Sequence, residues 1–198
     1  VPPWAQGEGN FTHMTILYLI VARGGSKRIP KKNLQMINGL SLIGYKAKAS
    51  PKAVLSTEDS RLMQEGRFYG LEILIRPEAL AQDHTPTELV VKSAMENLPR
   101  HTAIMLLEPS SPFVSSKTYE AAIEMMIEKD ADFIFGHVLY LFKWDWLKTR
   151  QDLYDNLTDK CYYVDMPTSE AVDIDTPHDL EHARWLAANG YVDLSWAK

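Results

Sequence analysis

The chain has 198 residues, of which 45% are hydrophobic and 24% are charged, and this composition predicts one globular domain with a hydrophobic core. The formal net charge of -5 argues against a general nucleic-acid binder, so basic residues that gather in one loop are a local feature. The single cysteine, Cys161, excludes an internal disulfide and a cysteine-based zinc cluster.

Two further observations bear on location and domain organisation. Residues 1–13 lack the hydrophobic segment of a signal peptide, and no run of about 18 apolar residues predicts a membrane span. We therefore expect a cytoplasmic protein whose partners include neither nucleic acid nor a membrane. We expect residues 1–13 to be a flexible N-terminal extension or tag and residues 14–198 to form a single domain.

The first predicted element is a buried strand over the apolar run Ile16–Ala22. The loop that follows, residues 23–33, contains two glycines, one serine and five basic residues. Glycines let a backbone approach phosphates closely, and basic side chains neutralise their charge. The loop is therefore expected to hold a nucleoside triphosphate, and the alternative is a basic loop that is simply solvated. For Arg28 and Lys31 we favour the alternative and expect solvated charges.

Further along the chain, strands and helices are expected to alternate. The predicted strands are Val54–Thr57, Leu71–Ile75, Ala103–Leu107, Phe133–Phe135 and Tyr162–Met166. The predicted helices are Leu42–Ala49, one capped by residues 58–60 and ending at Gly66, Thr87–Asn97, Tyr119–Lys129 and His178–Asn189. This alternation predicts a mostly parallel sheet with helices on both faces, and ligands bind such sheets beyond the carboxyl ends of the strands. Arg23, Arg76 and Glu108 each follow such an end.

Three local patterns complete this prediction. Asn38-Gly39 predicts a turn that closes a short extended segment. Thr176 is expected to cap the last helix, with Pro177 as its first residue and Asp179 in its first turn. The pair Trp144 and Trp146 is expected in the core or at a subunit interface, and we favour the interface.

Five blocks in order resemble the acylneuraminate cytidylyltransferases, also called CMP-sialic acid synthetases. The first and longest runs from Ala22 to Asn33, and the others are residues 56–59, 76–78, 108–112 and 173–176. The resemblance implies a three-layer, Rossmann-like nucleotide-diphospho-sugar transferase fold. It also implies transfer of cytidine monophosphate from CTP to the anomeric hydroxyl of an acidic eight- or nine-carbon α-keto acid sugar, with release of pyrophosphate, by a homodimer.

The same resemblance assigns the nucleotide-binding residues. It implies that CTP contacts Arg23, Gly24, Ser26, Lys27, Lys32 and Asn33, with Arg23 and Lys32 as the main catalytic phosphate contacts. Arg76 matches a nucleotide-contacting arginine. Thr85 and Thr87 match a loop near cytosine and ribose, and helix capping is the alternative role for both.

Glu108 departs from the family, in which many members carry glutamine at this place. An ionised glutamate only accepts hydrogen bonds and would repel the carboxylate of the sugar. We therefore expect an acceptor that presents a hydroxyl or an amine there, such as a pseudaminic, legionaminic or amino-substituted Kdo-type sugar instead of N-acetylneuraminate. A purely structural Glu108 is the alternative.

Asp173 and Asp175 flank Ile174, so in an extended segment both carboxylates point to one side. Carboxylates, water and phosphate oxygens are the ligands that magnesium prefers, so we expect both to hold magnesium or manganese, with Asp175 catalytic. The alternative is an acidic cluster that complements the dipole of the following helix.

A second departure lies between Val138 and Leu139. Family members carry an insertion here that contributes acceptor contacts and reaches across a dimer partner, whereas Val138 runs directly into Leu139–Phe142. The dimerisation and acceptor insertion is therefore expected to be missing near residues 138–139. This keeps open an alternative function, a catalytically impaired nucleotide-binding module.

Overall fold

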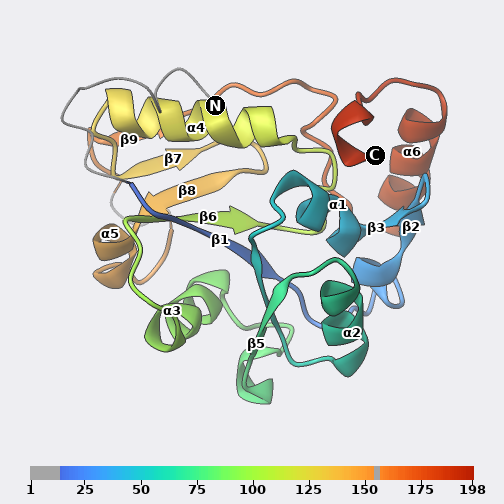
Figure 1. Cartoon of the computed structure of the whole chain (residues 1–198), viewed down its shortest axis with the longest axis horizontal. Coiled ribbons are helices and arrows are strands. Elements are labelled where there is room, and N and C mark those ends of the chain that lie inside the picture. Colours follow the sequence, from blue (N-terminus) through green and yellow to red (C-terminus); the bar gives the residue numbers. More distant parts are fainter. Residues whose placement is uncertain (1–13, 154–156) are drawn as a thin grey trace.

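The structure is a computed structural model that describes residues 14–153 and 157–198, so the expectation for residues 1–13 lies outside it. Its centre is a seven-stranded sheet in the order β5-β4-β1-β6-β8-β7-β9 (Figure 1). The strands are β1 (Ile16–Val21), β4 (Val54–Thr57), β5 (Glu72–Ile75), β6 (Ala103–Leu107), β7 (Phe133–Phe135), β8 (Tyr140–Lys143) and β9 (Cys161–Tyr163). Only β8 runs antiparallel to its neighbours within this sheet, which confirms the mostly parallel α/β prediction.

Helices cover both faces of the sheet and make three layers (Figure 1). One face packs against α1 (Leu42–Ala49), α2 (Ser60–Phe68) and α4 (Ser116–Glu128), and the other against α3 (Thr87–Asn97) and α5 (Trp144–Lys148). The side chains of β1 alternate between these faces, because successive residues of a strand point to opposite sides. Leu19 accordingly joins one core cluster and Ile20 the other.

The strand order creates a switch point beside β1. The chain runs from β1 to β4 and β5 on one side and then returns to β6 on the other side of β1. Adjacent loops therefore leave the carboxyl ends of β1 and β6 in opposite directions, and a crevice forms between them.

The connection between β7 and β8 is a tight turn. The amide of Gly136 donates to the carbonyl of Leu139 (2.8 Å), and β8 folds back antiparallel to lie between β6 and β7. The late strand is shorter than predicted, because pairing with β7 ends at Tyr163. The prediction of an interface for Trp144 and Trp146 is wrong, since both lie on α5 and are buried in the core cluster that also contains residues of α3.

Smaller elements close one end of the molecule. Asn38 and Gly39 have positive φ angles of 46° and 88° and join β2 (Met36–Ile37) to β3 (Leu40–Ser41), as predicted. α6 (Pro177–Ala188) begins with a capping box between Thr176 and Asp179, also as predicted. Short 3-10 turns lie at Lys32–Leu34, Glu78–Leu80 and Ser195–Ala197.

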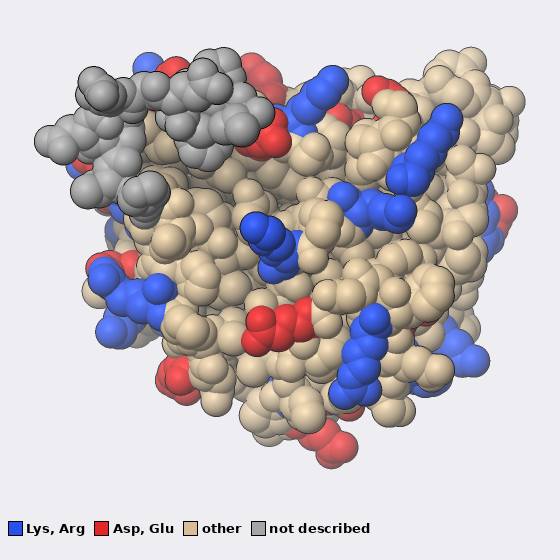
Figure 2. Space-filling model, in the orientation of Figure 1, with Lys and Arg blue, Asp and Glu red and all other residues tan. Residues whose placement is uncertain are grey.

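Charged side chains of both signs are scattered over the face shown in Figure 2. Among the helices of residues 14–153 and 157–198, none combines the length and apolar character needed to span a membrane.

Candidate active site

A pocket of about 220 Å³ lies beyond the carboxyl ends of β1, β5 and β6. Seven side chains line it that the sequence analysis assigned to CTP or, for Glu108, to the acceptor sugar. They come from four segments of the chain: the loop with Arg23, Lys32 and Asn33, then Arg76, the segment with Thr85 and Thr87, and Glu108. The expected convergence of Arg23, Arg76 and Glu108 is therefore observed. The strand order explains it, since the loops after these strands open on the same edge of the sheet.

The basic loop after β1 presents two cations to this pocket. The Arg23 side chain is about one-third exposed, whereas Lys32 is mostly covered. The Lys32 Nζ donates to the carbonyl of Ile174 (2.7 Å) and lies 3.3 Å from the Asp175 carboxylate. Asn33 is buried and its amide donates to the carbonyl of Arg23 (3.0 Å), so it fixes the start of the loop while lining the pocket.

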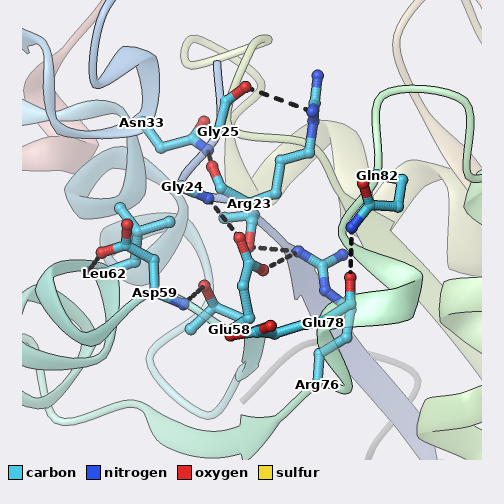
Figure 3. A network of polar contacts seen from close by, with 12 residues as sticks. Arg23, Gly24, Gly25, Asn33, Glu58, Asp59, Leu62, Arg76, Glu78 and Gln82 are labelled. Carbon is cyan, nitrogen blue, oxygen red and sulfur yellow. Dashed lines mark hydrogen bonds and ion pairs between the residues drawn. The ribbon is translucent and has the colours of Figure 1, made fainter.

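A buried ion pair between Arg76 and Glu58 holds the beginning of this loop (Figure 3). Glu58 was not among the predicted site residues. The Arg76 guanidinium contacts the Glu58 carboxylate (2.8 Å) and donates to the carbonyl of Ala22 (2.7 Å). The other oxygen of Glu58 accepts from the amide of Gly24 (2.7 Å). Arg76 is 6% exposed, so its guanidinium supports the loop from below the pocket.

Gly24 has no space for a side chain. A Cβ atom at this position would lie 2.0 Å from a carboxylate oxygen of Asp59, which caps α2. This close approach explains why the loop requires glycine beside Asp59. Glu58 and Asp59 belong to one of the five blocks that resemble the family, residues 56–59. That block is the feature of the sequence that could have indicated their importance.

The remaining predicted loop residues lie outside the pocket lining. Lys27 is exposed and forms an ion pair with Asp83, and Ser26 donates its amide to the carbonyl of Gly24 (3.1 Å). Arg28 and Lys31 are exposed, as expected for solvated charges, but the Arg28 guanidinium also lies 3.8 Å from the Asp175 carboxylate.

Thr85 and Thr87 both line the pocket, and neither acts as a side-chain cap. The N-cap residue of α3 is Pro86, with no side-chain hydrogen bond to the first turn of the helix. The structure therefore gives no support to the capping alternative.

The acidic segment before α6 lies next to this pocket. The amide of Ile174 donates to the carbonyl of Ser110 (2.8 Å), one of the pocket residues. Ile174 is fully buried while Asp173 and Asp175 are exposed, so the expected alternation is observed. Thr176 and Asp179 form the capping box of α6, whereas the Asp175 carboxylate lies 3.3 Å from Lys32 and 3.8 Å from Arg28. Within the described residues, no three or more His, Cys, Asp or Glu side chains are arranged to hold a metal by themselves.

Glu108 forms the floor of the pocket and has unusual electrostatics. Burial raises the pKa of its carboxyl group, and the neighbouring Asp173 carboxylate adds to this, while the cations of Lys46 and Lys32 act against it. Lys46 on α1 is fully buried behind the floor, and its Nζ donates to the Tyr119 hydroxyl (2.9 Å). Burial lowers the pKa of Lys46 to about 7, although Glu108 and Glu170 favour its charged form.

Because the pKa of Lys46 is lowered in the folded protein, the free energy of unfolding should change with pH in the alkaline range. Between pH 7 and 10.5 the unfolded chain binds the proton that the folded chain has lost, so the free energy of unfolding rises with pH, by at most about 1.4 kcal/mol per unit. Urea unfolding at pH 7, 8 and 9 should show this rise in the wild type and lose it in Lys46→Met. Lys48→Met, on an exposed position of the same helix, should behave as the wild type. A wild-type profile that is flat over this range would contradict the assignment.

The fold and the pocket together define an α/β protein with a candidate site at the switch point of a mostly parallel sheet. The solved structure of CMP:2-keto-3-deoxy-manno-octonic acid synthetase complexed with CTP superposes with a TM-score of 0.71 at 15% identity, over 89% of this chain and 99% of the other. This likeness confirms the predicted fold class.

Residues 17–189 match the cytidylyltransferase family, and the chain belongs to that family. It is 30% identical over 134 residues to pseudaminic acid cytidylyltransferase of Campylobacter jejuni, covering 62% of this chain and 58% of the relative. It is 32% identical over 124 residues to CMP-N,N'-diacetyllegionaminic acid synthase of Legionella pneumophila, covering 57% and 53%. The matched segment thus spans just over half the length of these relatives.

Proposed function

We propose that this chain transfers cytidine monophosphate from CTP to the anomeric hydroxyl of an acidic α-keto acid sugar and releases pyrophosphate. The observation that carries the proposal is the gathering of seven predicted residues around one pocket at the switch point of the sheet. The membership of residues 17–189 in the cytidylyltransferase family supports the choice of CTP. The homodimer and the cytoplasmic location stay predictions.

The residues of the pocket supply the positioning that this reaction needs. The acceptor oxygen must attack the α-phosphorus in line with the departing pyrophosphate, on which negative charge develops. Arg23 and Lys32 are placed to neutralise that charge, and the Glu58–Arg76 pair holds their loop in its conformation. Thr85 and Thr87 offer hydroxyl groups to the nucleoside end of the substrate.

Asp173 and Asp175 fit a magnesium ion on the chemistry of their donor groups. Two exposed carboxylates on one side of an extended segment are the protein ligands that magnesium takes when phosphate oxygens and water complete its shell. Bound there, magnesium would neutralise charge on the phosphates. Lys32, which contacts Asp175, keeps this acidic segment next to the phosphate-binding loop.

Glu108 is placed to select the acceptor. Ionised, it would accept hydrogen bonds from a hydroxyl or an amine of the sugar. Its raised pKa also favours the protonated form, which both donates and accepts and so resembles the glutamine of other family members. The ionised form favours a pseudaminic, legionaminic or Kdo-type sugar, and the names of the bacterial relatives agree with the first two.

A direct assay tests this function. Pyrophosphate release should require CTP, a divalent cation and one acid from a panel of N-acetylneuraminic, pseudaminic, legionaminic and Kdo-type sugars, and the product should contain CMP linked to the sugar. Under the same conditions ATP, GTP and UTP should give much less product. Binding of CTP without turnover on any of the sugars would instead favour a nucleotide-binding module.

A further inference from the structure

The two cations at the mouth of the pocket share one carboxylate that comes from a different loop. Asp83 lies between the 3-10 turn Glu78–Leu80 and α3, and its two oxygens form ion pairs with Arg23 and Lys27 respectively. Asp83 itself lines the pocket. In Figure 3 the guanidinium of Arg23 extends toward Gly25 and away from Arg76, so it belongs to the mouth and not to the buried network below.

This arrangement has the chemistry of an anion site filled by the protein. The Asp83 carboxylate bridges an arginine and a lysine of a glycine-containing loop, and it neutralises their positive charge as a bound phosphate group would. The same two cations hold the pKa of Asp83 below its usual range, so the bridge is present at neutral pH. An incoming polyphosphate would compete with the Asp83 carboxylate for the charge of Arg23 and Lys27.

We propose that the Asp83 carboxylate competes with the polyphosphate of the nucleotide for Arg23 and Lys27 and so sets the affinity of the site for its nucleotide. The inference rests on the proposed function, which makes residues 23–33 the phosphate-binding loop. The apparent affinity of a site falls with the fraction of molecules in which it is free. The Asp83 bridge lowers the fraction of molecules in which the site is free. It also excludes anions whose charge is too weak to displace Asp83 from both Arg23 and Lys27.

The competing explanation is that Asp83 only tethers the loop that carries Thr85 and Thr87. The two explanations predict opposite effects of removing its charge. If Asp83 competes with the ligand, Asp83→Asn tightens binding. If it only holds the loop in place, the same change leaves binding unaltered or weakens it, because the threonines lose their position. The side chain is over one-third exposed, so the amide is tolerated by the fold.

The experiment compares the wild type with Asp83→Asn in calorimetric titrations with CTP and, separately, with inorganic pyrophosphate. Both ligands should bind the variant about fivefold to tenfold more tightly, since exposed pairs of this kind are individually weak. The affinity of the variant should also fall more steeply with added salt, because ions of the solvent then replace the internal carboxylate. Glu78→Gln is the matched control, an exposed residue five positions away whose change in charge is the same and which should leave both affinities unchanged.

Each outcome decides between the explanations. Equal or weaker binding of pyrophosphate by Asp83→Asn overturns the inference, and so does an equal gain in Glu78→Gln, which would show a general effect of net charge. Tighter pyrophosphate binding with no CTP binding in either protein supports the role of Asp83 and overturns the proposed function instead.

Discussion

Asp175→Asn is expected to lower the rate of CMP transfer by at least about 100-fold while the fold stays intact. The substitution keeps the shape of the side chain but removes the charge that contacts Lys32 (3.3 Å) and that would bind magnesium. The side chain is about half exposed and the cap of α6 is supplied by Thr176 and Asp179, so the helix keeps its start.

The measurement has two parts. Steady-state turnover at saturating CTP reports the loss of rate, and CTP binding with and without magnesium reports whether the dependence on the cation has been lost. Asp173→Asn should have the same two effects. Glu181→Gln on α6 changes the charge equally without touching the acidic segment, and it should retain full turnover. Full activity in Asp175→Asn would remove this residue from the site.

Arg76→Met is expected to destabilise the folded protein by about 3 kcal/mol, because it leaves the buried Glu58 carboxylate without its charged partner. It also removes the hydrogen bond to the carbonyl of Ala22 at the end of β1. The start of the loop after β1 should loosen as a result, since Glu58 also accepts a hydrogen bond from the amide of Gly24. Denaturant unfolding of the ligand-free protein measures this effect separately from any contact with nucleotide.

A double-mutant cycle identifies the origin of the loss. The double variant Glu58→Gln and Arg76→Met should be less destabilised than the sum of the single variants, with a coupling of about 1 kcal/mol or more. Unchanged stability in Arg76→Met, combined with weaker CTP binding, would mean that this arginine serves the nucleotide alone.

Local patterns predicted much of the fold and the place of the site. Apolar runs and caps located the strands and helices that position the pocket, and α1, β4, α3 and β6 have the predicted bounds. The family blocks named seven of the residues that line the pocket. The exposure of Asp173 and Asp175 on either side of the buried Ile174 also follows from a two-residue period, which can be read directly from the sequence.

Other features depend on which segments meet, and a local pattern does not contain that information. The turn at residues 136–139 carries no strong signal, yet pairing inserts β8 between β6 and β7. Trp144 and Trp146 resemble interface residues in sequence, but α5 folds them into the core. α4 begins before the predicted Tyr119, where the backbone amide and hydroxyl of Ser115 donate to the distant carboxylate of Glu170.

The sequence by itself determined the fold class, the family and the segments that converge on the pocket, because each depends on neighbouring residues. Only the tertiary structure decided how the charges are distributed within the site. It paired Glu58 with Arg76 beneath the loop, buried Lys46 behind Glu108, and placed Asp83 across Arg23 and Lys27. These contacts join residues that are distant in the chain, and the sign and strength of each charge depend on burial and on partners that only folding brings together.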